Sequence, residues 1–176
     1  CTIQYSDGYI YTGFWNSETK DANFVCVSAT DEDPDNPTET KYATWTYAVQ
    51  GGFYWAGAYI TDKYAIVGSD DGESDSTSDS SYVYCFDKLT GEVVQKVGPH
   101  HGDIRSDISY YDGRIYFTSK GGYLYSYNLK EDGTIDTENL IEPIEIGKMS
   151  TSTPAIANGR CYVGSSYGSN FSGTYG

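Results

Sequence analysis

Short apolar and aromatic runs alternate with tight turns along the whole chain, and no window shows the sustained apolar stripe of an amphipathic helix. Four of these runs open on an Asp-Gly or Asn-Gly turn or its Asp-Lys variant. They begin at residues 7, 62, 112 and 158, which are 55, 50 and 46 residues apart. Asp-Gly and Asn-Gly between apolar runs favour a β-hairpin, because these residues accept the positive φ of a tight turn. The pattern predicts one hairpin unit repeated four times.

Each unit is expected to contain four antiparallel strands, the first before this turn and the second after it. The expected first strands are 59–60, 108–110 and 154–156, the third strands are 24–27, 82–86 and 123–127, and the fourth strands are 43–47, 93–97 and 141–146. The second strands are apolar on both faces, with Ile10, Ala65, Ile115 and Cys161 on one and Tyr11, Ile66, Tyr116 and Tyr162 on the other. A sheet with two apolar faces is expected to lie between two neighbouring sheets.

Four antiparallel strands in a unit of about 50 residues are typical of a β-propeller blade. The sequence therefore predicts an all-β fold with a single partial propeller domain over residues 1–176. Its repeats would cover about 1–55, 56–104 and 105–150, with an incomplete fourth over 151–176. An irregular β-sandwich is the alternative.

Three blades and the start of a fourth do not close a ring, so one blade face would stay wet. A face of roughly 300 Å² left in water forfeits on the order of 7 kcal/mol at about 25 cal/mol per Å². We therefore expect a fragment of a larger propeller, whose remaining blades, or another copy of the chain, cover the open faces.

The chain is strongly acidic, with 25 Asp and Glu against 11 Lys and Arg and a formal net charge of −14. This charge repels nucleic-acid phosphates and anionic lipids, so neither is an expected partner. No run approaches the roughly 18 consecutive apolar residues of a membrane span.

Two acidic segments, 31–37 and 70–79, are expected to be solvated hairpin tips. Calcium binding is the alternative for the second, because the hard Ca²⁺ ion takes six to eight oxygen ligands. Its candidate ligands are Asp70, Asp71, Glu73 and Asp75. Segment 71–76 lacks the sixth-position glycine of the helix-loop-helix calcium motif.

The chain also contains four cysteines, Cys1, Cys26, Cys85 and Cys161. Cys26 and Cys85 fall at the same strand position in two units, and we expect the cysteines to be free, buried and used as small apolar residues.

Two connections between units contain candidate binding residues. In segment 51–57, Phe53, Tyr54 and Trp55 stand among glycines and could stack on a sugar ring or a peptide; packing near the central channel is the equal alternative. His100 and His101 are the only histidines. Adjacent histidines on an extended chain point in different directions, so a solvated turn is expected, with a ligand-binding, metal or general-base role as the alternative.

Two segments resemble the repeats of the PQQ-like, or quinoprotein alcohol-dehydrogenase-like, propellers. One is Asp87-Lys88-Leu89-Thr90-Gly91-Glu92-Val93-Val94, which is similar to the turn and fourth strand of that repeat, and the other is 152–165. The resemblance extends over almost the whole chain and implies a propeller fold. The tryptophan of the family's fourth strand is matched by Trp45, whereas Gln95 stands at that place in the next unit.

Propellers of this family serve as enzymes, assembly scaffolds and surface modules, so the resemblance leaves the function open. Its dehydrogenases use PQQ and Ca²⁺ against a pair of adjacent cysteines, which this chain lacks. No Ser-His-acid arrangement or phosphate-binding glycine loop is recognisable either. We therefore expect no catalytic residues and no cofactor. The sequence favours a non-catalytic binding or scaffold module of a secreted or cell-surface bacterial protein, with a protein or glycan ligand on its loop face. A fragment of a PQQ-dependent oxidoreductase is the alternative.

Overall fold

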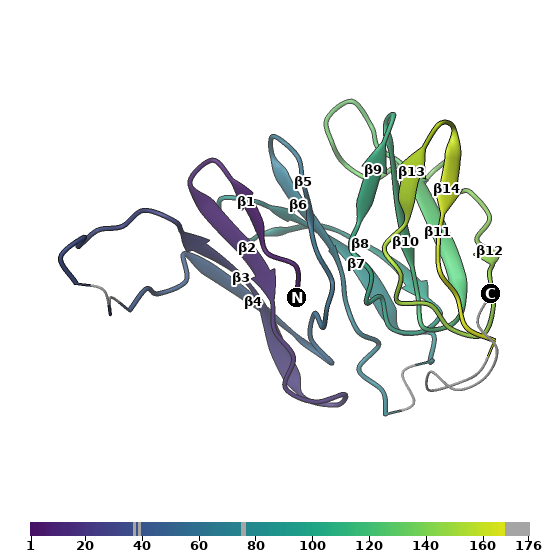
Figure 1. Ribbon diagram of the computed structural model, residues 1–176, viewed down its shortest axis with the longest axis horizontal. Coiled ribbons are helices and arrows are strands. Elements are labelled where there is room, and N and C mark those ends of the chain that lie inside the picture. Colours follow the sequence, from purple (N-terminus) through teal and green to yellow (C-terminus); the bar gives the residue numbers. More distant parts are fainter. Residues whose placement is uncertain (37, 39, 75–76, 168–176) are drawn as a thin grey trace.

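The computed structural model describes residues 1–36, 38, 40–74 and 77–167. These residues form only β-strands, turns and loops, which confirms the all-β class. Three four-stranded antiparallel sheets follow one another in chain order, and a two-stranded hairpin comes after them (Figure 1). Within the described ranges, no helix has the length and apolar character needed to cross a membrane.

The strands of each sheet pair in the order in which they occur in the chain. The first sheet consists of β1 (Gln4–Ser6), β2 (Tyr9–Gly13), β3 (Asp21–Ser28) and β4 (Trp45–Gln50). The second consists of β5 (Tyr59–Ile60), β6 (Tyr64–Gly68), β7 (Ser81–Asp87) and β8 (Val93–His100). The third consists of β9 (Ser109–Tyr111), β10 (Arg114–Thr118), β11 (Tyr123–Asn128) and β12 (Ile144–Glu145), and the final hairpin of β13 (Ala155–Ala157) and β14 (Arg160–Tyr162).

Every strand expected from the sequence is present, with shifts at its ends. One extension with a consequence for the site is in β8, which was expected to stop at residue 97 and continues to His100. A register irregularity between Ser81 and Val83 lets β7 pair with β8 as far as His100. Conversely, β12 shrinks to two residues of the expected segment 141–146.

The repeated turns adopt the backbone conformation that their sequence predicts. Asp7, Asp112 and Asn158 have φ of 51°, 48° and 52°. The glycine after each has φ between 70° and 85°, so both central residues of each turn are left-handed, as in a type I′ hairpin. The Asp-Lys variant forms its turn differently, because the Thr61 hydroxyl accepts hydrogen bonds from the backbone N–H groups of Lys63 and Tyr64.

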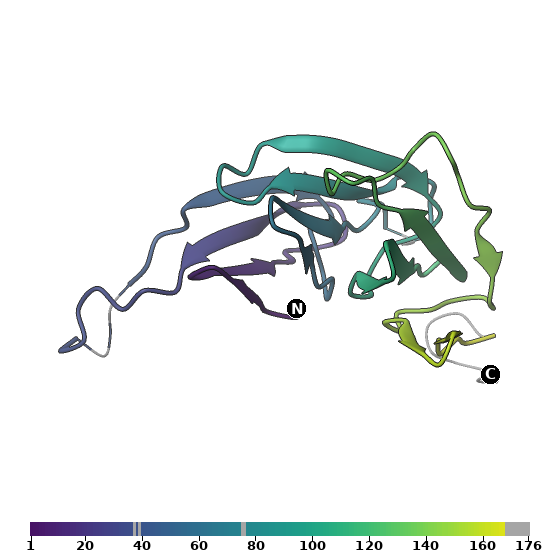
Figure 2. The same cartoon turned by 90° about the horizontal axis from the view of Figure 1, so that it is seen from above.

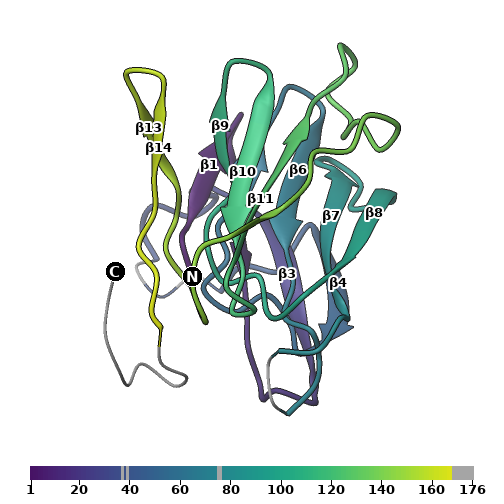
Figure 3. The same cartoon turned by 90° about the vertical axis from the view of Figure 1, so that its right-hand side faces the viewer.

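Two apolar cores separate the three sheets. The first, between the first and second sheets, is rich in aromatic side chains such as Phe24, Trp45 and Phe86. The second, between the second and third sheets, includes Ile66, Ile115 and Phe117. The middle sheet is therefore covered on both faces, as the two-sided apolar pattern predicts. Figures 2 and 3 show the sheets side by side, with the β13–β14 hairpin beyond β9, which it contacts.

Neighbouring sheets are also joined by one side chain at an equivalent position of the fourth strands β4 and β8. Trp45 pairs in register with Cys26, and its indole Nε1 donates a hydrogen bond of 2.9 Å to the Lys88 carbonyl in the turn before β8. Gln95 pairs in register with Cys85. Its amide donates to the Ile135 carbonyl at 3.0 Å and accepts from the Ile135 N–H at 2.7 Å. Gln95 thus joins the second sheet to the third with a pair of hydrogen bonds, where Trp45 joins the first to the second with one.

The cysteines follow the prediction in part. Cys26 and Cys85 are buried at equivalent positions in the third strands of two sheets, as expected. Cys1 and Cys161 are exposed, so the expectation of burial is wrong for these two. Cys161 lies in the final hairpin, where the described residues place no further sheet against it.

Candidate ligand site on the loop face

Two kinds of loop meet at one end of the sheets. One is the connection that follows the fourth strand of each sheet, and the other is the loop between the second and third strands. The two form backbone hydrogen bonds with each other. Phe53 N donates to the Phe14 carbonyl, Ile104 N to Ser69 and Ser150 N to Ser119, at 3.0 to 3.1 Å. These three bonds make Trp15, Asp70 and Lys120 equivalent positions, and Tyr54, Arg105 and Thr151 another equivalent set. The same backbone frame therefore presents different side-chain pairs at successive sheets, and we call this end the loop face.

Aromatic rings occupy the first of these pairs. Trp15 stacks on Tyr54 with ring centres 4.9 Å apart, and Tyr54 stacks on Trp55 at 4.4 Å. Both indoles are well exposed, Trp15 at 42% and Trp55 at 40% of their surface. These three residues are named the aromatic stack below. Large exposed rings in contact with one another are typical of binding surfaces.

The loop that contains Trp55 has one residue more than the corresponding loop of the next sheet. Tyr59, Ser109 and Ala155 are equivalent first-strand positions, because each pairs with the same position of the second strand. Six positions separate Phe53 from Tyr59, whereas five separate Ile104 from Ser109. The extra residue is accommodated with Trp55 at φ of 62°, a left-handed conformation that bulky residues rarely adopt.

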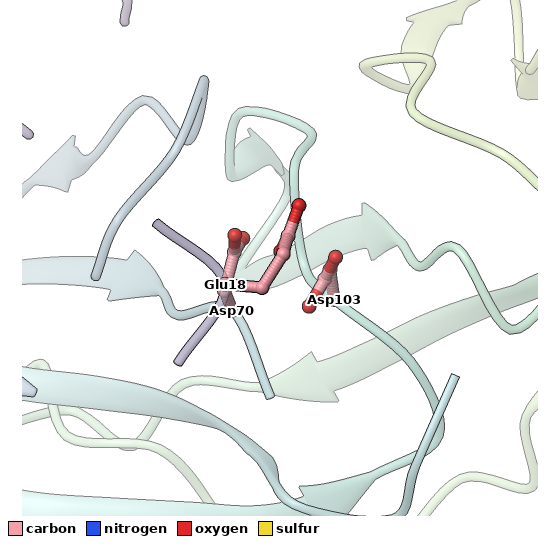
Figure 4. A group of neighbouring side chains, drawn as sticks. All are labelled: Glu18, Asp70 and Asp103. Carbon is pink, nitrogen blue, oxygen red and sulfur yellow. The ribbon is translucent and has the colours of Figure 1, made fainter. Parts of the chain in front are cut away.

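Charged side chains occupy the second pair, centred on the buried Arg105. Its Nη2 lies 2.8 Å from a carboxylate oxygen of each of Glu18, Asp70 and Asp103. Its Nε also donates to Asp70 at 3.2 Å, so the guanidinium grips that carboxylate with two nitrogens. Figure 4 shows the three carboxylates, here called the carboxylate cluster, converging from different loops.

The cluster holds more negative charge than Arg105 can neutralise. One Nη2 has two hydrogens for three oxygens, and Asp103 Oδ2 is left without a hydrogen bond of good geometry although it is buried. The Lys120 ammonium lies 3.6 Å from this oxygen. With all groups ionised, three carboxylates, one guanidinium and one ammonium leave a formal charge of −1.

Burial in this environment raises the pKa of both aspartates. Loss of hydration is the main cause for Asp70, whose pKa the Asp103 charge raises further, against the opposing effect of Arg105. Loss of hydration likewise raises the pKa of Asp103, again against Arg105. Burial therefore opposes the ionised form of both aspartates.

Arg105 also connects the charged and aromatic halves of the loop face. Its guanidinium carbon lies 4.8 Å from the Tyr54 ring centre and 5.9 Å from that of Trp55. Both distances are in the range of cation–π attraction. The aromatic stack is thus positioned by a guanidinium that is itself held by three carboxylates.

The candidate aromatic residues from the sequence divide between the two hypotheses. Phe53 is fully buried and packs on Phe24, Tyr84 and Phe86 in the first core, as the packing alternative predicted. Tyr54 and Trp55 belong to the loop face, as the binding hypothesis requires.

The histidines correct another expectation. His100 does not lie in a solvated turn: it ends β8, it is buried against Phe117 and Tyr125, and its Nε2 is 2.8 Å from the Tyr127 hydroxyl. The register of β8 carries it into the second core. His101 is half exposed and pairs with Asp79 at 2.7 Å. The two rings have different partners, the Tyr127 hydroxyl for His100 and the Asp79 carboxylate for His101.

The second acidic segment is only partly solvated. Asp70 and Asp71 are buried, contrary to the expected hairpin tip, because Arg105 pairs with Asp70 while Asp71 organises the loop. The Asp71 carboxylate accepts hydrogen bonds from the N–H groups of Glu73 and Ser78. Glu73 is exposed, and Asp75 lies outside the described residues. Among the described residues, the cluster of possible metal ligands includes Asp70 but neither Asp71 nor Glu73. In the first acidic segment, residues 31–36 are exposed as expected.

The carboxylate cluster is the grouping that could hold a cation within the described ranges, since its oxygens lie within 4.8 Å of one another. Arg105 Nη2 already stands at 2.8 Å from all three carboxylates. A metal ion would have to replace the guanidinium, which therefore acts as the resident cation of the cluster.

Sequence reasoning missed Trp15, Glu18, Asp103 and Arg105. The repeat alignment contained a signal for two of them, because Trp15 and Arg105 stand at positions equivalent to Asp70 and Tyr54. Glu18 lies 87 residues from Arg105 in the chain, and no local pattern links the two.

Comparisons with known proteins show the fold and nothing further. No family model matches the chain, and no curated protein matches it. Among solved structures, the computationally designed Ika8 protein superposes with a TM-score of 0.60 at 13% identity over 93% of this chain. The chain spans 42% of that designed chain.

Proposed function

We propose that this chain is part of a β-propeller that works as a non-catalytic binding module, with its ligand on the loop face. Successive four-stranded sheets with equivalent registers, joined by Trp45 and Gln95 at equivalent positions, support the propeller. The first strands of neighbouring sheets also approach one another, β1 near β5 and β9 near β13, as they would around a common axis. A place outside the bacterial cell or on its surface is part of the same proposal.

The observation that carries this function is the exposed aromatic stack held on a buried ionic network. Exposed indoles offer broad apolar contact area with little rotational freedom to lose on binding. Here both indoles stack on Tyr54, and Arg105, which is paired with three carboxylates, lies over the Tyr54 and Trp55 rings. A rigid aromatic surface at loops that a sheet scaffold positions is suited to recognition of a protein or glycan.

The test is binding by the complete chain and by the variants Trp15→Ala and Trp55→Ala, screened on a glycan array and in pull-downs with defined protein ligands. We expect each variant to weaken the ligand about tenfold, as loss of an aromatic hot spot does, while thermal unfolding stays close to that of the wild type. Tyr42→Ala is the matched control, because Tyr42 is 89% exposed on the loop between β3 and β4, which projects away from the sheets (Figures 1 and 2).

Two results would contradict the proposal. Ligand binding that is insensitive to both tryptophan substitutions would remove the loop face from recognition. Dye-linked alcohol oxidation by the chain after addition of PQQ and Ca²⁺ would show that it is an oxidoreductase and not a non-catalytic binding module.

A further inference from the structure

We propose that the loop-face ligand is a cationic segment of a polypeptide, whose lysine or arginine side chains lie on the exposed indoles of the aromatic stack. This inference rests on the proposed binding function and names the chemistry of its ligand. It combines two neighbouring features, exposed indoles and an excess of carboxylates over cationic groups.

The aromatic stack already contacts one cation. The Arg105 guanidinium lies over the Tyr54 and Trp55 rings, which shows that their geometry accepts a planar cation. Because Arg105 is nearly fully buried, the exposed parts of Trp15 and Trp55 are left to face solvent. Indoles attract ammonium and guanidinium groups more strongly than the other aromatic side chains do.

The charge balance favours a cation over a neutral or anionic ligand. Asp103 Oδ2 is buried and lacks a hydrogen bond of good geometry, and with all its groups ionised the cluster has a formal charge of −1 after Arg105 and Lys120 are counted. Negative charge held in a poorly solvated region acts on nearby ligands over a longer range than charge in water. Glu18 brings part of this charge to the rim, since a third of its side chain is exposed.

The field of the whole molecule acts in the same direction. A net charge of −14 draws a cationic segment towards the chain and repels sulfated or uronic-acid glycans. A neutral glycan would use the same indoles but would gain nothing from the excess carboxylate. The cluster itself is not the binding pocket, because Arg105 occupies its centre; the ligand lies outside, on the rings, with the carboxylates behind them.

The test measures binding of three fluorescent decapeptides to the complete chain at 150 mM NaCl: alternating arginine and glycine, alternating serine and glycine, and alternating glutamate and glycine. A neutral glucose hexasaccharide is the fourth probe. We expect measurable binding of the arginine peptide alone. Trp55→Ala should weaken it about two- to fivefold, the range of an exposed cation–π contact.

Matched variants separate the loop face from general attraction to an acidic protein. Glu18→Gln and Glu32→Gln each remove one negative charge, but Glu32 lies on the exposed first acidic segment. Glu18→Gln is expected to weaken the arginine peptide up to about fivefold, and Glu32→Gln and Tyr42→Ala are expected to leave it unchanged.

The outcomes are distinguishable. Equal effects of Glu18→Gln and Glu32→Gln, or no effect of Trp55→Ala, would overturn the cationic-ligand inference. Binding of the hexasaccharide through Trp15 and Trp55, with no binding of the arginine peptide, would also overturn it while leaving the proposed binding function intact. If neither these probes nor the broader screen reveals a ligand that depends on the indoles, both proposals fail.

Discussion

At the scale of single residues, the molecule depends on buried polar groups whose burial the sequence did not predict. Arg105 neutralises part of a three-carboxylate cluster, and His100 is enclosed by aromatic rings. Burial of each group is tolerated because particular partners surround it. The free energy of unfolding of the chain is therefore sensitive to substitution of these residues or to pH.

Arg105→Met should destabilise the chain strongly, because it leaves the carboxylate cluster buried without its cation. Loss of one partner of a buried ion pair costs about 3–5 kcal/mol. Urea unfolding measures this loss, which should be smaller at pH 5 than at pH 8.5, since the orphaned carboxylates then take up protons. Arg160→Met, at an exposed arginine, is the control. A loss below about 1 kcal/mol at pH 8.5, comparable to that of an exposed pair, would show that the network contributes little.

His100 should make the chain less stable in acid. Burial lowers the pKa of His100 to about 4, below its usual value near 6.5. The unfolded chain therefore binds the proton first, and the stability present above pH 6.5 is lost as the pH falls towards 4, by roughly 3 kcal/mol in total. His100→Phe should remove this part of the pH dependence.

Asp70 and Asp103 change the stability with pH in the direction opposite to His100. The effect of His100 is therefore measured as the difference between the wild type and His100→Phe. The raised pKa values of Asp70 and Asp103 mean that the folded chain holds their protons more tightly, which adds stability as the pH falls. Urea unfolding of the wild type and His100→Phe at pH 7.5 and pH 4.5 isolates the histidine. Parallel pH profiles for the two proteins would contradict the assignment.

At the scale of elements, the first and second sheets are joined where a turn of one packs closely against a side chain of the other. The turn between β7 and β8 accepts Trp45 from the first sheet, and Gly91 in that turn has φ of 75°. A Cβ atom at Gly91 would lie 2.6 Å from the Trp45 ring. Both the left-handed conformation and the close approach therefore require glycine.

Gly91→Ala should cost more stability than Gly113→Ala, although the two glycines have nearly the same φ. Gly113 has φ of 78° and open space where its Cβ would stand, so its substitution carries only backbone strain of about 1 kcal/mol. At Gly91 the collision with Trp45 adds to this strain, for a total of about 2–4 kcal/mol. Urea unfolding of both variants, and of Gly91→Ala combined with Trp45→Ala, provides the measurement.

The double substitution shows which cause is responsible. If the collision matters, the loss from Gly91→Ala shrinks once Trp45 is removed, because the two sites are in contact and their effects are not additive. If Gly91→Ala and Gly113→Ala lower the free energy of unfolding equally, the whole effect comes from backbone conformation and not from the collision with Trp45.

At the scale of the whole molecule, the sheets differ in how well their neighbours protect them. The second sheet has apolar cores on both faces, and the strands β6 and β7 are almost entirely buried. The β13–β14 hairpin is largely exposed over its described residues. Local opening should therefore be easiest at the hairpin and hardest at the centre.

Hydrogen exchange followed by mass spectrometry should show this gradient. Peptides covering β6 and β7 are expected to exchange slowest, those covering β1 to β4 and β9 to β11 at intermediate rates, and those covering β13 and β14 fastest. The reason is that exchange requires the strand to leave its apolar contacts on each covered face. Uniform protection across all sheets would indicate one cooperative unit without such a gradient.

Local chemistry in the sequence was enough to predict the strands, the repeated turns and the all-β class. Asp-Gly and Asn-Gly specify left-handed turns within a few residues, and two-sided apolar strands require neighbours on both faces. The same local pattern placed Cys26 and Cys85 at equivalent buried positions and identified the segment containing Tyr54 and Trp55. None of these predictions needed information from distant parts of the chain.

Only the tertiary structure decided which polar residues became a site. Glu18, Asp70 and Arg105 come from loops far apart in the chain, and packing of the sheets brings them within hydrogen-bond distance. Trp55 is exposed on the loop face, whereas Phe53, two residues earlier, enters the core. Turn chemistry acts over a few residues, but burial, charge pairing and pKa depend on which loops the stacked sheets place side by side.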